Sequence, residues 1–346
     1  MAVYTTIDDA GAYFKTVLYT GTGSSLGVTG VGFQPDFTWI KNKDASDFHV
    51  LTDAVRGVTK YISCNADTAE TTNAESLKTF DSDGFTVGTQ AEVNTNTEKY
   101  VSWNWKAGTT TGIGAGSQTI TPTAYSINTT SGIGIYAYTA NNTQGATISH
   151  GLGTAPKMML FKKLNGAADW KVYHVSVGNT QAMILNDNSV PTTDGGFFDD
   201  TTPTSTLITF GNDAGINGGT NQFVCYAFTD IAGYSQFSSY KGNGNADGAF
   251  IYTGFRPAFV MVKRTDSTSN WGMFDDKRDP YNVVENTQFA ASATTDDTTT
   301  DRMDFYSNGF KNRTSDASWN TTGDYIYMAF AESPFVNSSG GPSNAR

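Results

Sequence analysis

Three histidines are the first candidates for chemistry, because imidazole serves both as a metal ligand and as a general base. They are His49, His150 and His174. No two of them stand at the spacing that zinc motifs use, which is roughly three to five residues between ligands. We therefore expect these histidines in turns or at the surface, and we expect no catalytic residue, no metal site and no bound cofactor.

Paired carboxylates are the second candidates, because they serve acid–base chemistry and calcium binding. Three adjacent pairs occur, at Asp199-Asp200, Asp275-Asp276 and Asp296-Asp297. Neighbours on a strand point to opposite faces, so an adjacent pair does not supply two carboxyl groups across a cleft. The last pair lies in the polar run ATTDDTTTD, which lacks EF-hand spacing, so we favour a loop over a calcium site there.

An aspartate followed by an arginine recurs at two corresponding places. These are Asp53 with Arg56 and Asp276 with Arg278, and the third corresponding place holds Val175 without an arginine. Catalysis is not normally needed twice in one chain. We therefore predict structural ion pairs rather than catalytic ones.

Trp170 and Trp271 are the candidate ligand-contact residues. Both stand fourteen residues after a proline, in the pairs DW and NW. Core packing is one interpretation of such large aromatic residues, and a platform for the C–H faces of sugars is the other. The sequence leaves both interpretations open.

Composition narrows the classes of partner. The chain has 346 residues and a formal net charge of −11, with 16% charged and 13% aromatic residues. An acidic chain repels a phosphate backbone, so we expect no nucleic-acid partner. Cys64 and Cys225 are too few for a disulfide scaffold; we expect two buried free thiols, with a single bridge as the alternative. No apolar run approaches about 18 residues, so we expect no membrane insertion.

Four short patterns recur three times in the same order. The first is a tyrosine before a turn, at Tyr19, Tyr138 and Tyr240. The second is a proline with a lysine six residues later, at Pro35, Pro156 and Pro257. The third is Gly-Phe after a turn residue, in DSDGF, DGGFF and YSNGF, and the fourth is an aromatic strand, in YVSWNWKAG, FVCYAFTDI and YIYMAFAES. The glycine precedes the aromatic strand by 16 residues in the first and third repeats and by 27 in the second, which we interpret as an insertion.

The repeat predicts an all-β protein of three tandem sandwich-like modules of roughly 100 residues each, since that length matches a small domain rather than a solenoid unit. Turn signals, prolines at strand starts and alternating aromatic residues all favour strands. We expect an N-terminal docking segment, from Met1 to about Tyr19, followed by the first module within residues 1–112. The second module is expected at 113–235 and the third at 236–346, with a Gly/Thr-rich linker at 108–123.

Several long strings in these repeats resemble a module of structural proteins from marine tailed bacteriophages, a cyanophage-like group. They include GFQPDFTWIKNKDASDFHVLTDAVRG, ISHGLGTAPKMMLFKK and GYSQFSSYKGNGNADGAFIYTGFRPAFVMVKR, and the resemblance runs from about Tyr13 to Phe335. It implies tail-fibre-like modules with a concanavalin-like or jelly-roll fold, and it brings no catalytic residues with it. Related proteins often hold many more modules than three.

The resemblance implies a non-enzymatic virion protein, and we expect a tail-fibre or receptor-binding appendage with lectin-like modules that engages the host surface. A capsid decoration or head-spike protein is the alternative, and a polysaccharide depolymerase is a third. The expected partners are other virion proteins, a glycan or protein receptor on the host, and further copies of the chain, with a homotrimer favoured. The start MAVYTTIDDAGAYFK lacks the features of a secretory signal, so we expect synthesis in the host cytoplasm and a place on the virion.

Overall fold

Antiparallel strands form nearly all the regular structure of the chain, which confirms the all-β prediction. The computed structural model describes residues 4–114, 118–298 and 302–343. The helices are single turns, at Ala10–Ala12 (η1), Ala91–Asn94 (α1) and Gly195–Phe198 (α2). None of the described helices has the length and apolar character needed to cross a membrane.

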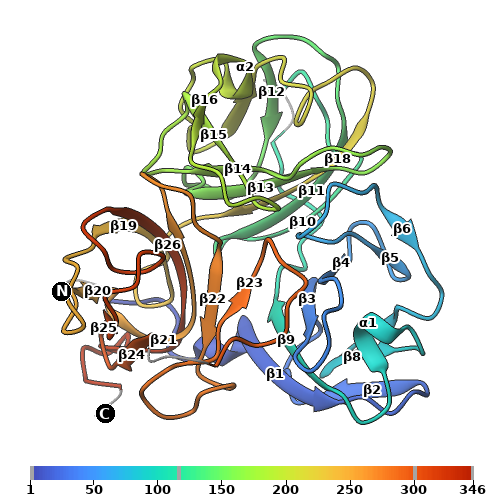
Figure 1. Cartoon of the computed structure of the whole chain (residues 1–346). Helices are drawn as coiled ribbons and strands as arrows, with labels where there is room; N and C mark the ends of the chain where they lie inside the picture. The colour runs from blue at the N-terminus through green and yellow to red at the C-terminus, as the bar shows by residue number, and fades with distance from the viewer. Residues whose placement is uncertain (1–3, 115–117, 299–301, 344–346) are drawn as a thin grey trace.

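The same strand order recurs in three large sheets (Figure 1). The first sheet runs β1 (Phe14–Thr20), β9 (Lys99–Trp105), β3 (Phe37–Asn42) and β4 (Val50–Asp53). The second runs β10 (Ala124–Asn128), β11 (Ile133–Thr139), β18 (Gln222–Phe228), β13 (Met158–Lys163), β14 (Lys171–His174), β15 (Gln181–Ile184) and β16 (Thr192–Thr193). The third runs β19 (Ser235–Lys241), β26 (Asp324–Pro334), β21 (Phe255–Arg264), β22 (Gly272–Asp275) and β23 (Gln288–Phe289). We name the three groups modules 1, 2 and 3.

Each module also has a smaller sheet. Module 1 has β2 (Leu26–Thr29), β8 (Gly84–Val87) and β7 (Leu77–Asp81), module 2 has β12 (Ala146–Ser149) and β17 (Leu207–Phe210), and module 3 has β20 (Phe250–Tyr252), β25 (Gly309–Asn312) and β24 (Met303–Tyr306). A short ribbon of β5 (Lys60–Tyr61) and β6 (Thr71–Thr72) belongs to module 1. In module 1 the small and large sheets enclose a cluster that includes Val28, Ile40 and Phe85.

The three large sheets meet in one shared core at the centre of the molecule, with a lobe for each module around it (Figure 1). This core contains Trp103 of module 1, Tyr226 of module 2 and Phe259 of module 3. On β3, Trp39 points into the shared core and its neighbour Ile40 into the core of module 1. The apolar runs that follow the prolines are therefore buried on both faces, as expected of strands with a continuous apolar sequence.

The tyrosine pattern and the aromatic-strand pattern form one feature, because their first residues lie opposite each other on paired strands. Tyr19 stacks on Tyr100 with 5.0 Å between ring centroids, Tyr138 on Phe223 with 5.5 Å, and Tyr240 on Tyr325 with 5.0 Å. Aromatic pairs in this arrangement stabilise a sheet beyond the area that they bury. The stacked pair therefore explains why both patterns recur in register.

A buried asparagine accompanies each stacked pair, and the sequence patterns missed it. The residues are Asn94, Asn217 and Asn320. The side chain of Asn94 donates to the carbonyl groups of Ser24 and Gly88 and accepts from the backbone N–H of Thr22 at 2.7 Å. It thereby holds the turn between β1 and β2 against the turn at α1. The signal in the sequence was an asparagine five or six residues before each aromatic strand.

The Gly-Phe pattern was wrong in module 2. DGGFF contributes to α2, and the strand that pairs with β12 is β17, which begins at Leu207. Leu207 precedes Phe223 by 16 residues, the same spacing that separates Gly84 from Tyr100. Module 2 therefore keeps the strand spacing of the other modules without the glycine, and the extra residues lie before β17.

The predicted docking segment is built into the fold, and the predicted linker, of which residues 115–117 lie outside the described residues, is tied to it at two points. β1 pairs with β9 along its whole length, and Ile7, Ala10 and Phe14 are buried, so the stretch up to Tyr19 is not a free docking arm. The first three residues of that segment lie outside the described residues. Within the predicted linker, isolated bridges join Thr109 to Ile127 and Ile120 to Ile148. The division into three domains stays a prediction, and the shared core argues against modules that fold separately.

Candidate functional site

Trp170 and Trp271 are core residues, so the sugar-platform interpretation was wrong and the core-packing interpretation is confirmed. Their side chains are 0% and 1% exposed. Each indole N–H crosses to another module: that of Trp170 donates to the carbonyl of Ser63 in module 1, and that of Trp271 donates to the carbonyl of Ile184 in module 2, both at 2.8 Å. Both tryptophans therefore join modules.

His49 takes the corresponding place in module 1, fourteen residues after its proline. Its Nδ1 accepts a hydrogen bond from the indole of Trp39 at 2.8 Å, which leaves the proton on Nε2. That Nε2 lies 3.1 Å from the carbonyl oxygens of both Phe289 and Ser292 in module 3. The three positions thus form a closed ring of donors, from module 2 to module 1, from module 3 to module 2, and from module 1 to module 3.

The three histidines are buried, so the expectation of surface histidines was wrong, although His49 and His150 lie in connecting segments, just before β4 and just after β12. Burial lowers the pKa of His49 to about 3 and that of His174 to about 4. Burial also lowers the pKa of His150, whose Nδ1 accepts from the backbone of Leu152. At neutral pH all three are uncharged, and their ring nitrogens form hydrogen bonds with backbone groups.

The predicted ion pair of module 1 is present and buried. Arg56 Nε lies 2.5 Å from Asp53 Oδ2, and the hydroxyl of Tyr226 in module 2 donates to the same oxygen at 2.6 Å. Burial alone would lower the pKa of Arg56, but the charge of Asp53 together with Tyr226 and Glu70 raises it. Arg56 therefore stays charged, and the hydroxyl of Tyr226 ties module 2 to this pair in module 1.

In module 3 the partner of Arg278 is Asp275, and the assignment to Asp276 was wrong by one residue. Arg278 Nε lies 2.6 Å from Asp275 Oδ2, and the indole of Trp103 in module 1 donates to that oxygen at 3.1 Å. The guanidinium group also lies over the Trp103 ring, 5.4 Å from its centroid. Neighbouring strand residues face opposite ways, so only one of the two aspartates reaches the junction.

The corresponding residue in module 2 is His174 and not Val175. His174 lies opposite Met158 on the neighbouring strand, as Asp53 lies opposite Phe37 and Asp275 opposite Phe259. The place of Trp103 and Tyr226 is taken in module 3 by Met328, which has no donor to offer. His174 instead has Nε2 3.2 Å from the carbonyl oxygen of Tyr327 in module 3. A histidine donor thus takes the place of the aspartate acceptor of the other modules, and modules 2 and 3 are joined as well.

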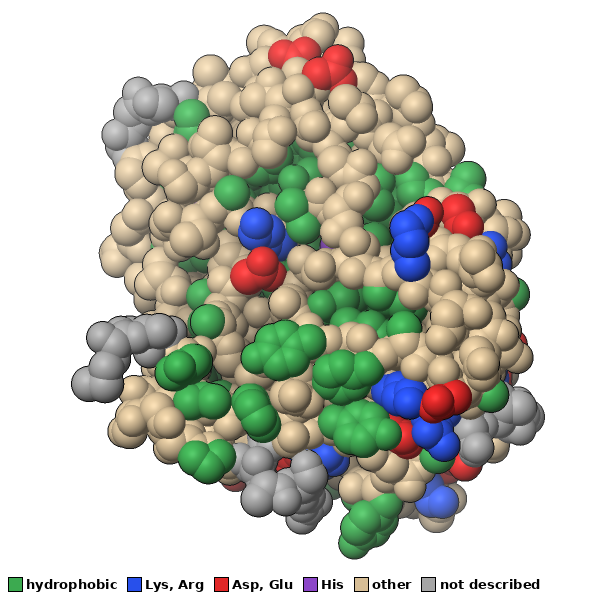
Figure 2. Space-filling model, turned by 90° about the vertical axis from the view of Figure 1, so that its left-hand side faces the viewer, with side chains coloured by type: hydrophobic (Ala, Val, Ile, Leu, Met, Phe, Trp, Pro, Cys, Tyr) green, Lys and Arg blue, Asp and Glu red, His purple; other side chains and the backbone are tan. Residues whose placement is uncertain are grey.

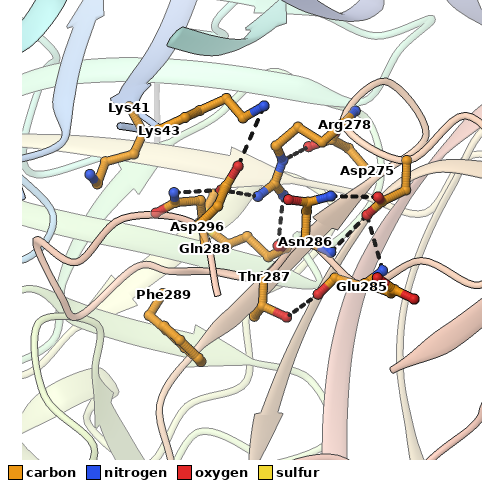
Figure 3. Close-up of polar contacts among 12 residues, drawn as sticks. Lys41, Lys43, Asp275, Arg278, Glu285, Asn286, Thr287, Gln288, Phe289 and Asp296 are labelled. Carbon is orange, nitrogen blue, oxygen red and sulfur yellow. Dashed lines mark hydrogen bonds and ion pairs between the residues drawn. The ribbon is translucent and has the colours of Figure 1, made fainter. Parts of the chain in front are cut away.

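Asp296 organises the junction between modules 3 and 1 (Figure 3). One carboxylate oxygen accepts from Arg278 at 2.9 Å and from Gln288 at 2.6 Å, and the other lies 3.5 Å from Lys43 Nζ. The carboxylate thus binds protein cations, which agrees with a structural role at the Asp296-Asp297 pair. Across the residues that the structure describes, no group of three or more histidine, cysteine or acidic side chains is placed to hold a metal ion.

Two of the three repeated lysines also make contacts between modules. Lys162 Nζ donates to the carbonyl of Asp67 in module 1 at 2.8 Å, and Lys263 Nζ donates to that of Asn188 in module 2 at 3.0 Å. Lys41, the third, donates within its own module, and its neighbour Lys43 makes the contact to module 3. Burial lowers the pKa of Lys41, Lys162 and Lys263 to about 8 in each case. Cys64 and Cys225 are free and buried, as predicted.

Exposed aromatic residues gather on module 3, where Figure 2 shows large hydrophobic side chains over the lower part of one face. Phe250 and Tyr252 on β20 are 46% and 59% exposed, with the buried Ile251 between them. The ring of Phe250 meets that of Tyr306 on β24 edge to face, with 6.0 Å between centroids. We name Phe250, Tyr252, Tyr281 and Tyr306 the module 3 aromatic surface.

A hollow of about 260 Å³ adjoins this surface. It is lined by Arg256, Pro280, Tyr281, Asn282, Phe305 and Tyr306. Arg256 pairs with Glu332 and donates to the carbonyl of Phe305 at 3.0 Å, and the Asn282 amide donates to the same carbonyl at 3.0 Å. The polar walls are therefore fixed by the backbone, and Tyr281, which is 79% exposed, stands at the rim.

Comparison with known proteins places the chain in a family without giving it an activity. No curated protein and no solved structure matches it. One family model matches residues 9–334, which covers all three modules as a single unit. The chain therefore belongs to the family described as Domain of unknown function (DUF7483).

Proposed function

We propose that this protein is a non-enzymatic component of a bacteriophage virion, a tail-fibre or receptor-binding appendage that attaches the particle to its host. The sequence resemblance to phage structural proteins supports this assignment. The structural observation that carries it is the use made of the reactive side chains. The buried histidines, lysines and Asp–Arg pairs form hydrogen bonds and ion pairs within the protein, most of them between modules.

A rigid particle protein benefits from such an arrangement. The Asp–Arg pairs of modules 1 and 3, together with the ring of hydrogen-bond donors formed by Trp170, Trp271 and His49, fix the three lobes relative to one another. Outside them the described residues present a largely polar surface, and exposed aromatic residues gather on module 3. Aromatic residues are enriched where proteins bind partners, so this surface fits contact with a host receptor. Assembly of the chain into a homotrimer remains part of the proposal.

Immunogold labelling of purified particles with an antibody against this chain tests the proposal. We expect label at the tail tip, together with a reduced rate of particle adsorption when host cells are first incubated with the purified chain. Label over the head would overturn the tail assignment and favour a capsid decoration protein. Absence of label from intact particles would overturn the virion assignment and favour the third alternative, a polysaccharide depolymerase.

A further inference from the structure

The module 3 aromatic surface is not required by the fold, and the internal repeat shows it. On β20, Ile251 lies opposite Phe310, as Val28 lies opposite Phe85 in module 1 and Ile148 opposite Ile208 in module 2. The positions on either side can therefore be compared directly among the three modules.

The comparison separates module 3 from the other two. The place of Phe250 holds Gly27 in module 1 and Thr147 in module 2. The place of Tyr252 holds Thr29 and Ser149. Tyr306 lies opposite Gly309 as Asp81 lies opposite Gly84, so its place in module 1 is aspartate. The corresponding positions in modules 1 and 2 hold small or polar residues. The aromatic side chains of module 3 are therefore not needed for packing of these strands.

Local geometry keeps these rings at the surface. A Cβ atom on Gly309 would lie 2.9 Å from Cζ of Phe250, so the ring rests across a glycine of the neighbouring strand. Gly254 has a φ of +79°, and its added Cβ would lie 3.6 Å from the hydroxyl of Tyr252. Each ring thus has one supported side and one side open to solvent.

The charge of the site indicates the kind of ligand. Among the described residues that line the hollow, Arg256 is the one charged side chain, and it is paired with Glu332. The hydroxyl of Tyr306 donates to Asp304, whose carboxylate lies 3.6 Å from Arg313. A neutral hollow beside exposed rings offers little to an anion and suits a neutral ligand with alternating C–H and hydroxyl faces.

We infer that the module 3 aromatic surface and its hollow bind a neutral glycan, with one hexose ring stacked on an aromatic face. This inference rests on the proposed attachment function and names the ligand class of its binding surface. Tyrosine suits such a ligand because its ring packs against C–H groups while its hydroxyl exchanges hydrogen bonds with sugar hydroxyls. The amide of Asn282, which bonds to both backbone groups of Phe305, lies in the wall of the hollow.

The test uses the full chain on a printed array of neutral and anionic hexose oligosaccharides. The main variant carries Phe250→Thr, Tyr252→Thr and Tyr306→Asp, residues that modules 1 and 2 already hold at these places. A second variant, Tyr281→Ser, changes a loop residue at the rim. Phe48→Ser is the matched control, since Phe48 of module 1 is also 48% exposed.

We expect the unaltered chain to bind neutral oligosaccharides, the triple variant and Tyr281→Ser to lose at least about tenfold in affinity, and Phe48→Ser to bind as the unaltered chain does. Equal binding by the triple variant, or binding of anionic glycans only, would overturn the inference. So would dimerisation of the unaltered chain through this surface in sedimentation experiments. Failure to bind any glycan by a chain that labels the tail would overturn the glycan inference and leave the attachment function standing.

Discussion

At the residue scale, side chains at equivalent positions of the three repeats make the contacts between modules. The spacing of fourteen residues after each proline predicted that Trp170 and Trp271 are equivalent, and the structure adds His49 as the third member. Their burial could not be predicted, because a strand alternation indicates two faces without telling which one meets another module. The one-residue errors at Asp276 and Val175 have the same origin, since counting residues does not fix strand register.

The buried Asp–Arg pairs give the first prediction. Asp53→Ala leaves Arg56 in the interior without its nearest carboxylate and deprives Tyr226 of an acceptor. We expect the free energy of unfolding to fall by about 3–5 kcal/mol in urea denaturation, the cost typical of breaking a buried pair on one side. Lys241→Ala, which removes an exposed pair with Asp324, is the control and should change stability little. Equal stability of the two variants would contradict a structural role for Asp53.

The buried histidines give the second prediction, a loss of stability in mild acid. An unfolded histidine has a pKa near 6.5, and burial lowers the pKa of His49 to about 3 and that of His174 to about 4. Between these values the unfolded state binds more protons, so stability falls as pH drops below about 6.5. At pH 5 each histidine should account for a loss of about 2 kcal/mol.

Urea midpoints at pH 7 and pH 5 measure this effect. His49→Gln and His174→Gln should each be less stable than the unaltered chain at pH 7 and should show a smaller difference between the two pH values. A variant that keeps the full difference would show that its histidine does not cause the acid sensitivity.

At the element scale, the sequence predicted the central strands but missed β17 and the asparagine ties. β17 was missed because the turn before it lacks the Gly-Phe signal, although its distance from β18 matches the other modules. The asparagines were missed because each is a single polar residue outside the strands, and only its recurring distance from the aromatic strand marks it. Their role depends on backbone groups that only the folded chain brings together.

The third prediction concerns these ties. Asn94→Ala removes the bonds that hold the β1–β2 turn and leaves several backbone groups without their partner. We expect a loss of about 3 kcal/mol in the free energy of unfolding, the sum of a few net hydrogen bonds and an unsatisfied buried group. The neighbouring exposed Asn96→Ala is the matched control and should be nearly neutral. A loss no larger than that of the control would count against the tie.

At the scale of the whole molecule, three lobes around one core form a unit whose modules complete one another. Apolar strands buried on both faces were predictable, but the identity of the second covering layer was not. A second sheet, a neighbouring module or another copy of the chain all satisfy the same sequence pattern. The structure identifies that layer as the other two modules, so modules 1 and 2 support the surface that module 3 presents.

The fourth prediction is that modules 1 and 2 do not fold without module 3. A chain ending at residue 234 lacks module 3 and would expose the tryptophans and phenylalanines of the shared core. We expect it to be unfolded or aggregated by circular dichroism and gel filtration. A soluble, cooperatively folded fragment with an intact tryptophan spectrum would contradict the shared-core account.

Differential scanning calorimetry of the full chain tests the central claim most directly, namely that the three modules form one cooperative scaffold for the module 3 surface. A shared core predicts a single transition whose calorimetric enthalpy equals its van't Hoff enthalpy. Two or three separate transitions, each with the enthalpy of about 100 residues, would show independent modules in a row and contradict the account.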